Sequence, residues 1–355
     1  MKRIADAIIE TKGYDIRTKY IYGSRKAWRI PSFITEIDQE FFSAFGQFGG
    51  CTDFKTLLKA LDMDEATFDE YFPELSSVKT AKTITKKEMA NLRQTFKNSP
   101  RYVQRVMEQA DRERPIVLDY LRQEIDFNEK FAFAEYWGRG YTQDCLTRLL
   151  CAAAGREIED PFYYVRSIYP TDGLSVRHNF TVTRASLLFV EALFANLPYR
   201  SITQYQWDGD KIVPVLVDCD NDKALHEAFS YYLPQFARDF YSMELLDEDT
   251  AEKELFDFAM RYFQESTTDP CIVDNVGHLK DSVELYGKVR EFAPPITFHS
   301  FIERAGGKWF HTRNIKISLA RSRKIYGRLY VLYHNKLRHK KSVRKIVRWK
   351  RRLFH

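Results

Sequence analysis

The chain has 355 residues, of which 44% are hydrophobic, 15% aromatic and 29% charged. These proportions argue against an intrinsically disordered chain and provide enough apolar residues for one large domain or two ordinary ones. The first residues lack the apolar stretch of a secretory signal, and no run approaches the roughly 20 apolar residues of a membrane span. We therefore expect neither a secreted, a membrane-spanning nor a fibrous protein.

The net charge of +6 is divided unevenly along the chain. Residues 308–355 contain 17 of the 55 Lys and Arg residues and no Asp or Glu, so the remainder is acidic. Basic residues interleaved with Trp and Phe are typical of binding to an anionic membrane surface. We expect this binding at Arg344, Lys345, Arg348, Trp349, Lys350, Arg351 and Arg352.

Other partners suit the same basic tail. It has the composition to contact nucleic acid phosphates, to dock on the acidic part of the chain, or to stay solvated. Nucleic acid is the weaker candidate because no familiar nucleic-acid motif occurs elsewhere. The five cysteines are scattered, with no C-x-x-C pair, which favours a reducing cytoplasm and argues against a disulfide framework or a zinc cluster.

Residues 18–22 are β-branched and aromatic and predict a short strand, after which Ser24 is a candidate N-cap for a helix starting at Arg25. The pattern from about 34 to 128 is helical. Thr85 to Glu88 matches a capping box, and Ser99-Pro100 begins a long helix. Pro115 is expected to kink that helix or to split it in two.

A clear strand follows at 130–136, with a helix beginning near Thr142 and a second strand at 162–168. Residues 175–179 read as a polar loop in which His178 is a possible substrate contact, although a lone histidine is more often structural or solvated. Residues 184–195 predict an apolar helix. A hairpin is predicted between 200–206 and 211–217, because the Asp-Gly between them suits a tight turn. From Lys223 to about Arg304 the chain is mostly helical and acidic.

Strands alternating with helices predict an α/β fold with a mainly parallel sheet. We expect residues 1–33 and 129–222 to form this α/β core and residues 34–128 to form a helical insertion. An acidic helical region at 223–307 and a basic amphipathic tail at 308–355 complete the organisation.

The strongest chemical feature is the sequence Gly138-Arg139-Gly140 between a strand and a helix. Such a turn presents backbone N–H groups at the positive end of a helix, which suits a phosphate or a carboxylate. Arg139, Thr142 and Gln143 are candidate ligand contacts. The G-x-G pattern is weak evidence, since it lacks the third glycine of a dinucleotide fingerprint, and a purely structural turn explains it equally well.

The turn at Gly23 has the same predicted geometry. Ser24, Arg25 and Lys26 follow it at a helix start, where two cations oppose the helix dipole unless an anion binds there. A solvated basic turn is the alternative. Asp218 and Asp220 follow an apolar strand and imitate the nucleophile and the acid/base of a HAD-type phosphotransferase, which would need Mg²⁺ between them. A polar turn after an edge strand is the simpler interpretation.

Three stretches follow one another along the chain: the S-R-K-A segment within Tyr20–Phe33, the G-R-G-Y-T-Q segment within Phe133–Gln143, and the V-P-V-L segment that closes Phe189–Leu216. Together, and in this order, they resemble predicted HAD-superfamily-like proteins of bacterial capsule and lipopolysaccharide gene clusters. In that family an Asp-x-Asp segment precedes the first stretch, whereas the 17 residues before the strand here contain none. The family's second-block aspartate corresponds to Glu135 or Tyr136.

The resemblance therefore implies the later part of such a protein, or a version without phosphatase chemistry. It implies a Rossmann-like or HAD-like fold for the α/β core. It also implies surface polysaccharide biosynthesis at the cytoplasmic membrane face, with a phosphorylated sugar or nucleotide sugar as ligand. Two alternatives stay open: a non-enzymatic accessory subunit that recruits a glycosyltransferase to the membrane, and a Mg-dependent phosphotransferase using Asp218 and Asp220. The sequence identifies no certain cofactor.

Overall fold

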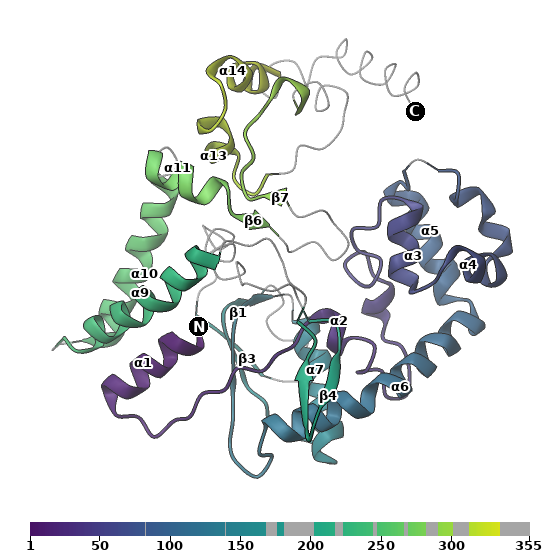
Figure 1. Ribbon diagram of the computed structural model, residues 1–355, viewed down its shortest axis with the longest axis horizontal. Helices are drawn as coiled ribbons and strands as arrows, with labels where there is room; N and C mark the ends of the chain where they lie inside the picture. The colour runs from purple at the N-terminus through teal and green to yellow at the C-terminus, as the bar shows by residue number, and fades with distance from the viewer. Residues whose placement is uncertain are drawn as a thin grey trace.

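The protein is described by a computed structural model, shown in Figure 1. The described residues are 1–81, 83–138, 140–167, 176–180, 202–216, 223–243, 247–265, 269–281, 290–300 and 312–333. Within them the chain is a mixed α/β protein with one small parallel sheet of three strands and many helices. The predicted α/β class and parallel sheet are confirmed at this level.

The sheet has the order β1-β2-β3, with strands β1 (Phe133–Gly138), β2 (Phe162–Ser167) and β3 (Arg177–Asn179). Both pairings are parallel, with Phe133 opposite Phe162 and Phe162 opposite Arg177. Helix α7 (Tyr141–Ala154) connects β1 to β2. The predicted strands at 130–136 and 162–168 and the helix between them are confirmed. The polar loop expected at 175–179 instead contributes β3 to the sheet.

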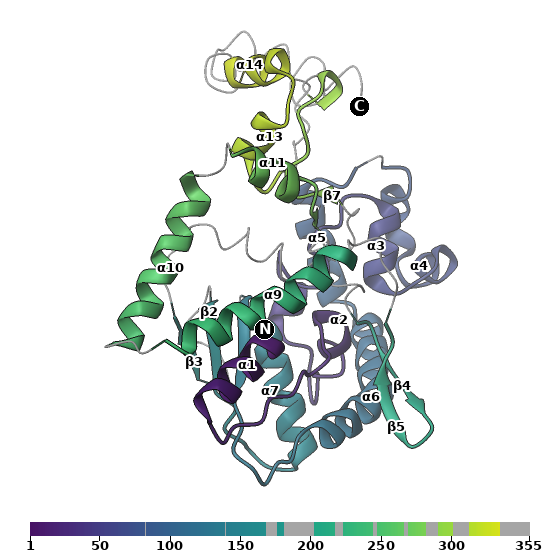
Figure 2. The ribbon, with the colours of Figure 1, turned by 60° about the vertical axis from the view of Figure 1, so that its left-hand side comes forward.

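Helix α7 and helix α6 (Pro100–Glu124) lie side by side and build the core beneath the sheet (Figure 2). Leu146, Leu149 and Leu150 of α7 are buried at the spacing expected of one helix face, and they cluster with Leu121 of α6 and Phe162 of β2. This core fixes the start of α7, and with it the β1–α7 turn, relative to the sheet.

A second core belongs to the helical unit, which we define as the elements from η1 to α5 with the first half of α6. It contains η1 (Gln39–Phe42), α3 (Phe54–Leu61), α4 (Glu65–Tyr71), η2 (Pro73–Val78) and α5 (Lys86–Lys97). Phe48, Phe72 and Phe96 are almost fully buried here, and the ring of Phe96 contacts the rings of the other two. The predicted capping box is confirmed, since Thr85 and Glu88 bond reciprocally at the start of α5.

Helix α6 runs through Pro115 as one helix of 25 residues, so of the two predicted outcomes, a kink or a split, the split does not occur. Its first half contributes Tyr102 and Val106 to the core of the helical unit. Its second half contributes Val117 and Leu121 to the core beneath the sheet. Because residues in both halves are buried in these cores, the helix tolerates the loss of the backbone hydrogen bond that a proline removes.

The strand predicted at 18–22 is also wrong, because these residues pair with no strand that the structure describes. At Tyr22, tyrosine hydroxyls take the place of the hydrogen bonds that a neighbouring strand would form with the backbone. The Tyr22 N–H donates to the hydroxyl of Tyr120 at 2.9 Å, and the hydroxyl of Tyr205 donates to the Tyr22 carbonyl at 2.6 Å. Both backbone groups of Tyr22 are therefore satisfied without a neighbouring strand.

The predicted hairpin is confirmed, although it is shorter than expected. Strands β4 (Tyr205–Asp208) and β5 (Lys211–Pro214) pair antiparallel, with Asp208 opposite Lys211. Gly209 in the turn has φ 60°, a left-handed conformation that glycine adopts without steric strain.

The remaining elements come from the two ends of the chain. Helix α1 (Lys2–Lys12) packs against α9 (Lys223–Tyr241), as Figure 2 shows. The chain continues through α10 (Glu248–Glu265), α11 (Pro270–Gly277), β6 (Lys280–Asp281), β7 (Arg290–Glu291), α13 (Ile315–Ala320) and α14 (Lys324–Leu332). The mostly helical character predicted for 223–304 is confirmed where the structure describes it. The helix predicted at 184–195 and residues 334–355 lie outside the described residues.

Candidate functional site

The β1–α7 turn has the conformation that its glycines predict. Gly138 ends β1, and Gly140 is the N-cap of α7 with φ 93°. This left-handed conformation favours glycine over residues with a Cβ. Among the residues that the structure describes, no side chain forms a capping hydrogen bond at the start of α7. Arg139, between the two glycines, lies outside the described residues.

A buried arginine lies directly against this turn. The Arg177 side chain is 2% exposed and donates to the Gly140 carbonyl at 3.2 Å, to the Gln143 side-chain oxygen and to the Asp144 carboxylate. A Cβ at Gly140 would come within 2.5 Å of the Arg177 guanidinium. Gly140 is thus required twice, once for its backbone conformation and once for the close approach of Arg177.

The two predicted ligand contacts on α7, Gln143 and Thr142, lie in different environments. Gln143 is 2% exposed, and its side-chain oxygen accepts from Arg177 and from the hydroxyl of Tyr164 at 3.2 Å. Its side chain therefore holds Arg177 in place within the fold. Thr142 lies in the first turn of α7 and is half-buried.

The second predicted turn is a helix cap. Ser24 accepts from the N–H groups of Lys26 at 3.0 Å and Ala27 at 3.2 Å, and its hydroxyl donates to the carbonyl of Ile202. The predicted N-cap is confirmed, and the hydroxyl also joins the turn to the segment before β4. The helix it caps, α2 (Arg25–Trp28), is a single turn, on which Arg25 and Lys26 are exposed.

The two turns belong to one packed unit, because α2 lies against α7. The Arg29 guanidinium, just after α2, lies 5.4 Å from the ring centre of Tyr141. Arg148 of α7 contacts the segment that follows α2. It donates to the Ser32 carbonyl at 3.2 Å and to the Asp38 carboxylate at 2.8 Å. The Tyr141 hydroxyl donates to the same carboxylate at 2.7 Å.

The sequence analysis missed Arg29, which is 2% exposed. One of its terminal nitrogens donates to Gln47 at 2.9 Å, whereas its Nε and other terminal nitrogen have no hydrogen-bond partner in the described part of the chain. Arg148 pairs with the carboxylate of Asp38, whereas Arg29 forms no ion pair with a residue that the structure describes, so this region beneath the start of α7 carries excess positive charge. An arginine between apolar Trp28 and Ile30 was the only sequence signal for it.

This arrangement favours binding of an anion over proton transfer or nucleophilic attack. Burial raises the pKa of the Tyr141 hydroxyl, so it stays neutral and donates a hydrogen bond. Burial also raises the pKa of the Cys145 thiol, and a thiol without thiolate character is a poor nucleophile. Positive charge beneath a helix start attracts phosphate or carboxylate groups.

The third stretch of the resemblance completes the unit. The Trp28 indole donates to the Tyr205 hydroxyl at 2.8 Å, and the Tyr205 ring stacks on Tyr120 at 4.4 Å between centres. The described parts of all three stretches are therefore in contact through Trp28, Arg29 and Tyr205. Sequence reasoning placed them only in order along the chain.

Several predicted residues lie outside the described residues: Asp218, Asp220, Arg344, Lys345, Arg348, Trp349, Lys350, Arg351 and Arg352. Within the described ranges no group of three or more His, Cys, Asp or Glu residues is arranged to hold a metal ion. No described helix combines the length and apolar character needed to cross a membrane.

Comparison with known proteins assigns the chain to no family. No family model matches the chain, and no curated protein matches it significantly.

Proposed function

We propose that the chain acts in bacterial surface polysaccharide biosynthesis, binding a phosphorylated sugar or a nucleotide sugar at the β1–α7 turn. The observation that carries this proposal is the convergence of the two glycine turns on one packed unit with excess positive charge from Arg29 and Arg148 beneath it. A phosphate at the start of α7 would complement that charge and accept from N–H groups of the first helical turn.

The contacts we assign to the ligand are the first amides of α7, the Thr142 hydroxyl and Arg139. The exposed Arg25 and Lys26 at the start of α2 provide further positive charge for the approach of an anion. A glycine turn that follows the first strand of a parallel sheet is the arrangement expected in a Rossmann-like or HAD-like fold, and we propose that the sheet belongs to this class.

The resemblance places such proteins at the cytoplasmic face of the membrane, and the basic tail supplies a means of staying there. We propose that the tail binds anionic lipid through Arg344 to Arg352. One observation favours a second function, that of an accessory subunit without turnover. The side chains of Ser24 and Gln143 are engaged within the fold and leave fewer groups for a substrate.

A thermal-shift panel on the full chain separates these functions. It contains UDP-glucose, glucose 1-phosphate, inorganic phosphate and glucose, each with and without Mg²⁺. A ligand that binds only the folded state stabilises it by about 2.7 kcal/mol at 100 times its Kd. We expect the phosphorylated sugars to raise the melting temperature and glucose to leave it unchanged. A panel without any shift, together with binding to phosphatidylglycerol vesicles, would favour the accessory subunit.

A further inference from the structure

Helix α14 presents an exposed face that combines aliphatic and cationic side chains. Ile325, Val331 and Leu332 are all exposed, Ile325 at 61%. Lys324 and Arg328 are exposed beside them. At about 3.6 residues per turn, these five positions lie within about one third of the helix circumference. Apolar side chains that gather on an exposed surface in this way mark a contact site for another molecule.

The opposite face of α14 is packed against the fold. Gly327 and Tyr330 are buried, and a Cβ at Gly327 would lie 3.5 Å from the Leu319 side chain of α13. Arg321, directly after α13, donates to the Gly277 carbonyl at the end of α11 at 2.6 Å. These contacts hold α13 and α14 on α11 and turn the aliphatic and cationic face outward.

The charge around this face has one sign. Residues 312–333 contain six Lys and Arg residues and no Asp or Glu. Neither Lys324 nor Arg328 forms a hydrogen bond or an ion pair with any residue that the structure describes, and Glu291 nearby in the fold is already paired with Arg321. In both views α14 lies at the outer end of the molecule, away from the sheet (Figures 1 and 2). An extended anionic surface would complement this face.

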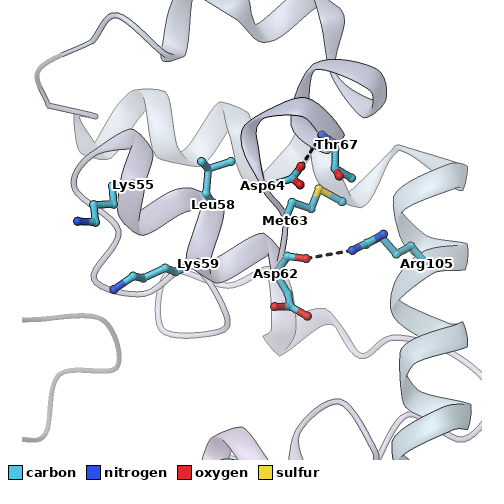
Figure 3. Close-up of a pocket in the computed structure, with 8 residues that line it drawn as sticks. All are labelled: Lys55, Leu58, Lys59, Asp62, Met63, Asp64, Thr67 and Arg105. Atoms are coloured by element: carbon cyan, nitrogen blue, oxygen red, sulfur yellow. Dashed lines mark hydrogen bonds between the residues drawn. The ribbon is translucent and has the colours of Figure 1, made fainter.

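A pair of cations on α3 lacks this arrangement. Lys55 and Lys59 lie four residues apart beside a surface hollow, and Figure 3 shows their ammonium groups directed away from Arg105 and Asp62. The carboxylates of Asp62 and Asp64 line the same hollow. Two exposed cations are therefore not a site in themselves, whereas α14 places its cations among exposed aliphatic side chains and carries no carboxylate.

We propose that the exposed face of α14 binds the surface of an anionic membrane. The three aliphatic side chains enter the boundary between headgroups and acyl chains, and the two cations contact lipid phosphates. Nucleic acid would use the cations and leave the aliphatic side chains without a partner, which favours lipid. The inference rests on the membrane location in the proposed function, and it adds a folded element to the lipid contacts proposed at Arg344 to Arg352.

Flotation of the full chain with vesicles tests the aliphatic contacts. We expect binding to vesicles of equal parts phosphatidylglycerol and phosphatidylcholine, and none to phosphatidylcholine alone. Ile325→Ser should weaken the binding about tenfold or more, because it removes apolar surface that lipid would bury. The matched control is Ile16→Ser, at an isoleucine that is 59% exposed in the segment between α1 and α2. It should stay within about twofold of the parent.

The double variant K324Q/R328Q tests the cationic contacts. It should weaken binding to the anionic vesicles about tenfold or more, because each cation near such a surface contributes to the attraction. The matched control K55Q/K59Q removes two charges with the same spacing from α3 and should stay within about twofold of the parent. All four side chains are exposed, and circular dichroism checks that the variants stay folded.

Several results would overturn the proposal. One is an affinity for anionic vesicles in Ile325→Ser or K324Q/R328Q equal to that of the parent, and another is equal weakening by each variant and its control. Vesicle binding that R348Q/R351Q abolishes and the α14 variants leave unchanged would assign lipid to the tail alone. Binding of duplex DNA by the parent without binding of vesicles, weakened by K324Q/R328Q, would assign the cations to nucleic acid.

Calorimetric titration with UDP-glucose separates this surface from the ligand site of the proposed function. The α14 variants should bind UDP-glucose as the parent does, and Arg139→Ala should bind vesicles as the parent does. A chain that binds vesicles through α14 but does not bind UDP-glucose would support the surface and count against the ligand site. A chain that binds UDP-glucose but no vesicles would overturn the surface and support the ligand site.

Discussion

Replacing Arg177 with methionine should destabilise the protein by about 3 to 5 kcal/mol, because it leaves a carboxylate without its buried partner. The Arg177 side chain is 2% exposed, and its guanidinium serves Asp144, Gln143 and the Gly140 carbonyl together. Methionine fills a similar volume but donates no hydrogen bond. The free energy of unfolding, measured in urea by circular dichroism, checks this expectation.

The matched control is Arg17→Met. Arg17 also pairs with a carboxylate, that of Glu129 at 2.7 Å, but the two side chains are 82% and 57% exposed. Exposed pairs of this kind contribute at most about 1 kcal/mol. If both variants lost the same small amount, Arg177 would not be the internal clamp of the β1–α7 turn that its contacts describe.

The substitution Gly23→Ala should destabilise the protein by about 3 kcal/mol, because the added methyl group has no room. A Cβ at Gly23 would lie 1.6 Å from the Trp28 ring. The indole must move, and its 2.8 Å hydrogen bond to the Tyr205 hydroxyl must lengthen or break. The loss would be measured as the change in the free energy of unfolding.

Two comparisons isolate the cause of that loss. Gly13→Ala introduces a methyl group with no atom within 4 Å but at φ 67°, so it should show only a backbone effect of about 1 kcal/mol. Trp28→Phe removes the ring atoms that the methyl at Gly23 would meet. Gly23→Ala should therefore destabilise a Trp28→Phe background much less than the parent, and additive losses would contradict the account.

Local signals were sufficient where one short segment determines the structure. The hairpin follows from Asp208-Gly209 between two β-rich runs, and the cap of α5 follows from Thr85 and Glu88. The β1–α7 turn follows from Gly138 and Gly140 between a strand and a helix. In each case the backbone conformation and its hydrogen bonds depend on residues a few positions apart.

Features that depend on distant partners could not be predicted in this way. Residues 18–22 have the composition of a strand, but Tyr22 bonds to hydroxyls about 100 and 180 residues away instead. Pro115 predicted a kink or a split, and burial of residues on both sides of it keeps α6 one helix. Residues 177–179 look polar, although Arg177 becomes buried against α7 as β3 joins the sheet.

The candidate site shows the same division. Sequence reasoning identified both glycine turns, but it did not show that Ser24 and Gln143 would be engaged within the fold. It also missed the buried Arg29, since its burial depends on how α2, α7 and the helical unit pack together.

Calorimetric titration of UDP-glucose into the full chain and its Arg139→Ala variant tests the proposed function most directly. The control is Arg93→Ala on α5, which removes the same charge away from the β1–α7 turn. We predict at least about tenfold weaker binding for Arg139→Ala, equivalent to about 1.4 kcal/mol, and an unchanged Kd for Arg93→Ala. Equal affinity in all three proteins, or no binding to the parent, would contradict a phosphorylated-sugar site at this turn.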